Sequence, residues 1–72
     1  MTAEECVEAF SRRAGLHPPS PDEMEQILRL ASVAAHASER KAAPIVCWVA
    51  GTSGKPIAEM LRYGEELTGS GG

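Results

Sequence analysis

The sequence predicts a small all-α protein, a four-helix orthogonal or irregular bundle in which the third helix is short. Two segments begin with a Ser or Thr placed three residues before a Glu, which is the capping box of a helix start. Apolar residues follow each box at helical spacing. Prolines and glycines divide the rest of the chain into two further apolar segments. The 72 residues suffice for one domain, which we predict to span residues 1–68, with residues 69–72 as a disordered tail.

The first helix is predicted over residues 3–14. Thr2 and Glu5 form its capping box, and Gly15 is the left-handed residue expected to end it. Leu16 can then fold back onto the helix as the apolar partner of this cap. The apolar face expected to enter the core consists of Ala3, Val7, Phe10 and Ala14.

The second helix carries the clearest start signal in the chain. Ser20 caps it, Pro21 occupies the first helical position and Glu23 completes the box, so we predict a helix that runs to about residue 39. It is apolar or small over most of its circumference, which indicates that other helices surround it. We therefore expect it to be the central element, with its alanine-rich second half packed against the third helix.

The third segment is ambiguous, because residues 45–49 are β-branched, short and bounded by proline and glycine, as in a buried strand. A lone strand would leave its backbone groups unpaired, and Pro44 suits the first turn of a helix. We predict a helix over residues 43–51, with Trp48 in the core or, alternatively, as an interface anchor.

The fourth helix is predicted from Pro56 to residue 67. Gly64 inside it costs about 1 kcal/mol relative to Ala. Either the helix packs closely against another element at that glycine, or it frays after Tyr63. The residues expected to face inward are Ile57, Met60, Leu61 and Leu67.

Composition limits the classes of function. The net charge is −3 and the basic residues occur only in pairs, which argues against nucleic-acid binding. No apolar run approaches the ~20 residues of a membrane span. Cys6 and Cys47 lie among apolar residues, so we expect free thiols and a cytoplasmic protein. The thin core predicts a monomer or a weak homodimer.

His36, Glu39, Arg40 and Lys41 are the only concentrated set of reactive side chains. His36 and Glu39 can meet on a helix, but a metal site needs at least three ligands, so no metal is predicted. Basic groups stabilise the last turn of a helix, and Glu39 can reach unpaired N–H groups near Pro44. In this interpretation these residues form a corner between two helices, and their role is structural. The alternative is a recognition surface in which Arg40 binds a carboxylate or phosphate.

Catalysis by this chain is not expected, because no nucleophile has a base nearby in sequence and no carboxylate pair sits in an apolar setting. The segment from Gly51 to Lys55 lacks the spacing of a phosphate loop, and Pro56 stands where such a loop needs Ser or Thr. No cofactor is predicted.

Residues 30–51 resemble a small bacterial domain family of unknown function, whose members carry an Ala-His-x-x-Glu-Arg-x-x-Ala-Pro run. The matching positions are Ala35, His36, Glu39, Arg40, Ala43 and Pro44. Members of that family occur alone or joined to the end of a nucleotidyltransferase that resembles the molybdenum-cofactor guanylyltransferases. The resemblance implies a connection to molybdopterin-guanine dinucleotide biosynthesis. It is weaker over the first two helices and is lost after Gly51, and it carries over no catalytic residue.

We therefore expect a non-catalytic protein-interaction or accessory domain, with another protein as its partner. The alternative is a small-molecule or nucleotide-binding domain in which His36 and Arg40 donate hydrogen bonds to an anion.

Overall fold

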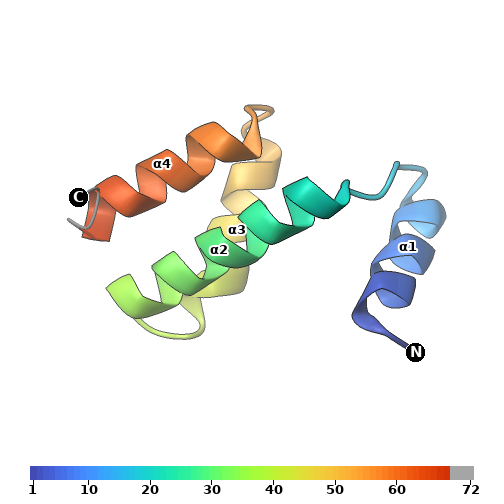
Figure 1. Cartoon of the computed structure of the whole chain (residues 1–72), viewed down its shortest axis with the longest axis horizontal. Coiled ribbons are helices and arrows are strands. Elements are labelled where there is room, and N and C mark those ends of the chain that lie inside the picture. The colour runs from blue at the N-terminus through green and yellow to red at the C-terminus, as the bar shows by residue number, and fades with distance from the viewer. Residues whose placement is uncertain (69–72) are drawn as a thin grey trace.

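The computed structural model describes residues 1–68, and within this range it contains four helices and no strand (Figure 1). The predicted all-α four-helix bundle with a short third helix is confirmed. Its helices are α1 (Ala3–Ala14), α2 (Pro21–Ala37), α3 (Ala42–Thr52) and α4 (Ile57–Thr68). Residues 45–49 are therefore helical. The predicted tail lies outside the described residues.

The two capping boxes form as predicted. In α1 the Thr2 N–H donates to Glu5 Oε1 at 2.7 Å, and the Glu5 N–H donates to Thr2 Oγ1 at 3.1 Å. Ser20 and Glu23 make the equivalent pair at the start of α2, at 2.8 and 3.1 Å. These bonds satisfy N–H groups that the first turn of a helix otherwise leaves without partners.

The helix ends follow the sequence less closely. Gly15 ends α1 at φ 75°, as predicted, but α2 ends at Ala37 rather than at residue 39. Ser38 leaves the helical region with φ −142° and ψ −99°. The fourth helix begins after Pro56, whose carbonyl accepts hydrogen bonds from the backbone of its first turn.

The core is small and is built on α2. Within the described chain, α2 packs against both α3 and α4, which touch each other only slightly. Leu30 of α2 is only 1 % exposed, and it is the largest fully buried side chain. The buried apolar residues are Leu30, Ala34, Ala50, Met60 and Leu61. The central position predicted for the second helix is confirmed with respect to α3 and α4.

Gly64 explains how α4 approaches α2. A Cβ at this position would lie 2.8 Å from Leu30 Cδ1 and 3.4 Å from Val33 Cγ1. Of the two alternatives for this glycine, close packing is therefore the correct one, and α4 continues past Tyr63. An ion pair between Arg29 and Glu65, 3.5 Å long, joins the same two helices at the surface.

α1 lies beside the N-terminal end of α2, away from α3 and α4, and packs against no other helix of residues 1–68 (Figure 1). The expectation that its apolar face enters the core is wrong, since Phe10 is 76 % exposed. Leu16, expected to fold back onto α1, is also exposed. On α2, Leu28 is also largely exposed.

Leu67, expected to face inward from α4, is 82 % exposed. It lies in the last turn of α4, where α3 and α4 have little contact with each other. Among residues 1–68, no helix combines the length and the apolar character needed to span a bilayer.

Candidate functional site

The motif residues lie around the turn that joins α2 to α3. His36 is in the last turn of α2, Pro44 is in the first turn of α3, and Glu39, Arg40 and Lys41 lie between them. All five are exposed. The turn is closed by its own backbone, through N–H groups of α3 that donate to the carbonyls of Glu39 and Arg40 at 2.9 and 3.1 Å.

His36 bonds backwards along its own helix. Its Nδ1 lies 2.8 Å from the Ser32 carbonyl oxygen, and because a carbonyl only accepts, Nδ1 carries the proton. The expected meeting of His36 and Glu39 does not occur among the described residues, where no hydrogen bond or ion pair joins them. The reason is local: α2 ends between these residues, so the three-residue helical spacing no longer applies.

Glu39 does not cap α3, contrary to expectation. The cap position of α3 is Lys41, which makes no side-chain cap bond, and the Glu39 carboxylate instead lies 3.8 Å from Lys41 Nζ. Both side chains are well exposed, so this ion pair contributes little. Arg40 has no ion pair or hydrogen-bonded partner for its guanidinium among the described residues. The corner thus presents three charged groups to solvent.

Trp48 is not part of the core. It is 70 % exposed, and two further large apolar side chains of α3, Ile45 and Val49, are exposed beside it at helical spacing. We call these three residues the α3 stripe. α3 contains no charged residue, so no charged side chain of this helix lies beside the stripe. α3 buries its other face, through Val46, Cys47 and Ala50.

An apolar groove lies between α3 and α4. It consists of two adjoining hollows of about 150 and 130 Å³. Leu30 and Gly64 form its floor, and the residues shared by both hollows are Leu30, Val46, Gly64 and Leu67. One hollow reaches Ser38 and Ala42, next to the charged corner. We call this feature the α3–α4 groove.

The sequence analysis offered Trp48 as an interface anchor only as the alternative and did not find Ile45, Val49 or the groove, although α3 contains a signal for them. Its four bulky residues, Ile45, Val46, Trp48 and Val49, are nearly consecutive, so they point around most of the helix. A helix packed on one side can bury only part of such a set, so some of it must remain exposed.

Two further observations concern the reactive side chains of residues 1–68. Burial raises the pKa of the Cys47 thiol, whose Sγ lies 3.8 Å from the Ile27 carbonyl oxygen, and a protonated thiol is a poor nucleophile. Within residues 1–68, no three His, Cys, Asp or Glu side chains gather as metal ligands would.

The segment from Gly51 to Lys55 closes α3. Ser53 Oγ donates to the Ala50 carbonyl at 2.6 Å and accepts from the Lys55 N–H at 3.0 Å, while Gly54 turns the chain at φ 73°. The Lys55 ammonium lies 5.5 Å from the centre of the Tyr63 ring. The backbone here ends a helix and holds the lysine over an aromatic ring.

Comparison with known proteins adds no relative: no family model, curated protein or solved structure matches the chain.

Proposed function

We propose that this chain is a non-catalytic protein-interaction domain that docks through the α3 stripe and the adjoining charged corner. The observation that carries the proposal is the exposure of Trp48, the only tryptophan, on a helix without charged residues. Tryptophan is enriched among the residues that dominate binding energy at protein interfaces.

The surroundings of Trp48 have the composition of an interface. Interfaces combine an apolar centre, poor in charge, with a polar rim. Here Ile45 and Val49 flank the tryptophan, and the turn that begins α3 supplies Arg40 and Lys41 at one end. Arg40 has no ion pair within the described chain, so a carboxylate of a partner can reach it without breaking an existing contact.

The partner we propose is an enzyme of molybdopterin-guanine dinucleotide synthesis. Its support is the resemblance of the corner, His36, Glu39, Arg40 and Pro44, to the family motif described above. Pro44 directly precedes Ile45 in the chain, so we propose that the motif and the stripe belong to one docking site. Both cysteines are free thiols, as suits the reducing cytoplasm in which we place this interaction.

Binding measurements with variants test this proposal. Proteins captured from extract by the tagged chain would be identified by mass spectrometry, and the candidate nucleotidyltransferase would be purified for calorimetry. We expect Trp48→Ala to weaken binding at least about tenfold, since an interface anchor contributes about 2 kcal/mol or more. The double variant Glu39→Ala, Arg40→Ala should weaken it as well.

Leu28→Ala is the matched control, because Leu28 is a similarly exposed apolar residue on another helix. It should bind as the wild type does. Equal affinities for wild type and Trp48→Ala would show that the stripe is not the docking surface.

A second candidate function is anion binding by His36 and Arg40, favoured by the solvent-exposed Arg40 guanidinium. His36 contributes less than the sequence implies, because its Nδ1–H already bonds to the Ser32 carbonyl. Titration with phosphate and GTP, followed by NMR, tests this function. Shifts confined to residues 36–41 at millimolar ligand would support it, and an unchanged spectrum would reject it.

A further inference from the structure

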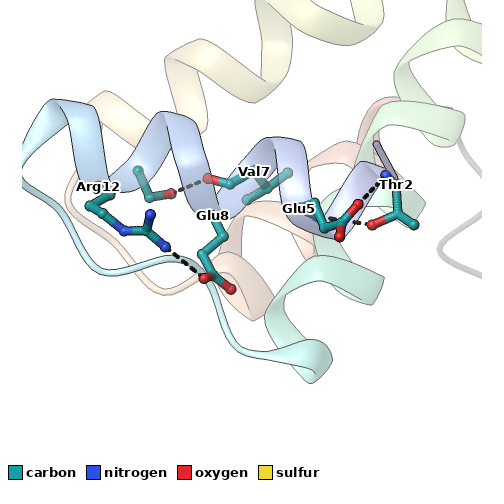
Figure 2. Close-up of polar contacts among 6 residues, drawn as sticks. Thr2, Glu5, Val7, Glu8 and Arg12 are labelled. Carbon is teal, nitrogen blue, oxygen red and sulfur yellow. Dashed lines mark hydrogen bonds and ion pairs between the residues drawn. The ribbon is translucent and has the colours of Figure 1, made fainter.

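The polar contacts of α1 are all internal to its own segment. Figure 2 shows the capping box of Thr2 and Glu5, the Glu8–Arg12 ion pair of 2.7 Å, and the Ser11 hydroxyl bonded to the Val7 carbonyl. No other helix of the described chain packs against α1. The Glu4 side chain lines a shallow hollow together with Met24 and Leu28 of α2.

A helix in this situation requires a partner. α1 has 12 residues, and isolated helices shorter than about 12–15 residues are marginal in water even with good sequences. Its apolar face carries Phe10, which is largely exposed, and Val7, which is half-buried. Packing of this face would supply the stability that the caps cannot.

The accessible surface area of the chain indicates how much of its surface a partner could cover. It exposes 5602 Å², whereas a compact monomer of 7.6 kDa exposes about 4,300 Å², a difference of about 1,300 Å². Residues 69–72 account for at most about 370 Å² of this difference. The remaining excess of about 900 Å² matches the roughly 800 Å² that each partner buries in a standard protein interface.

The α3–α4 groove is flanked by helices of about the same length as α1 and has the chemistry to receive its apolar face. At 1.5 Å per residue α1 is about 18 Å long, and the helices that wall the groove, with 11 and 12 residues, are about 16 and 18 Å long. The groove is lined by apolar side chains, and Leu67 stands exposed at its rim. An amphipathic helix laid in such a groove is a common recognition mode.

The linker directs α1 away from the groove of its own chain. Pro18 and Pro19 fix φ at two of the positions between α1 and α2, and each proline restricts the residue before it to extended conformations. A stiff hinge that keeps a helix off its own body favours exchange of that helix between two chains.

We propose that the protein forms a two-fold dimer in which α1 of each chain lies in the α3–α4 groove of the other. Phe10 enters the groove over Leu30 and Gly64, and Leu67 closes over it. Each half of the dimer then contains four packed helices, namely α2, α3 and α4 of one chain and α1 of the other. This inference does not depend on the enzyme partner proposed above.

The mass of the purified protein in solution tests the dimer, measured by light scattering and sedimentation up to millimolar concentration. We expect twice the 7.6 kDa of the chain for the wild type. Phe10→Glu should weaken dimerisation about 100-fold or more, because two phenylalanines lose their burial in each dimer. Ala9→Glu, which adds the same charge one quarter-turn away on α1, is the matched control and should leave a dimer.

Mixing two variants tests the exchange itself. Phe10→Glu prevents α1 from docking but leaves the α3–α4 groove intact. Leu67→Glu damages the groove but leaves α1 able to dock. Both residues are exposed within their own chain, so neither change should unfold α2–α4, which circular dichroism checks. Each variant alone should be monomeric, and the mixture should form a heterodimer through its one intact contact.

Other results overturn the proposal. A wild type that remains monomeric at millimolar concentration excludes the dimer. A dimer that survives Leu67→Glu but not Phe10→Glu indicates pairing of α1 with α1. Loss of the dimer in Trp48→Ala, with Phe10→Glu unaffected, indicates pairing through the α3 stripe. Because these measurements use pure protein, their outcome is separate from that of the enzyme-binding tests.

Discussion

The helices α1 and α4 have equal lengths, 12 residues each, but they are stabilised in different ways. α1 has a complete capping box, a left-handed glycine at its end and an internal ion pair, yet it has no buried residue. α4 contains a glycine that lowers its intrinsic helix propensity, yet it buries Met60, Leu61 and Gly64 against α2. α1 therefore depends on local interactions, whereas α4 depends on tertiary packing.

The difference shows that local signals determine where a helix begins and ends, but not whether it is stable. Caps and i,i+4 pairs contribute about 0.3–1.5 kcal/mol each, whereas burial of one Leu or Met contributes about 1.5–3 kcal/mol. We therefore expect α4 to resist opening more than α1 does within a single chain.

Leu30→Ala should cause the largest loss of stability. Leu30 is the residue on which α3 and α4 both pack, and a buried Leu→Ala change costs about 2–5 kcal/mol. A single core in a chain of this size contributes little more than that in total. Urea unfolding followed by circular dichroism should show α2–α4 largely unfolded without denaturant.

Leu28→Ala is the control for this change, since it makes the same substitution on the same helix at an exposed position. It should change the free energy of unfolding by about 0.5 kcal/mol or less. Similar losses in the two variants would contradict the position of α4 on α2.

Gly64→Ala should destabilise the protein although Ala is the better helix former. The new Cβ would meet Leu30 Cδ1 at 2.8 Å, and such overpacking costs about 1–3 kcal/mol against a propensity gain of about 1 kcal/mol. Gly51→Ala in α3 is the matched control, because no atom lies within 4 Å of the added Cβ. It should stabilise by up to about 1 kcal/mol. Opposite signs in urea unfolding are expected, and a stabilising Gly64→Ala would contradict the close approach.

The two capping boxes should give different results when each is removed. Ser20→Ala weakens a helix that belongs to the core, so it should lower the free energy of unfolding of α2–α4 by about 1 kcal/mol. Thr2→Ala removes the same type of bond from α1 and, in dilute monomer, should leave that free energy nearly unchanged. It should instead speed amide exchange within α1 alone. Equal effects on global unfolding would show that α1 is coupled to the core.

The helix boundaries show how much of the fold the sequence predicts. Thr2, Ser20 and Gly15 act through bonds to their own neighbours, so the starts of α1 and α2 and the end of α1 were predicted correctly. The end of α2 was predicted two residues too late, because Ser38 leaves the helix without a glycine or proline to signal it. The same break explains why His36 and Glu39, three residues apart, do not meet.

For residues 1–68, the sequence was enough to predict four helices, because capping residues, prolines and glycines act within a few residues of the chain. Which side chains are buried depends on how the helices pack. Phe10 and Leu67 were expected in the core, and Trp48 in the core or at an interface; all three are exposed, because burial depends on which helices come together. A periodic pattern identifies an apolar face, but the partner that covers it is found in space and not along the chain.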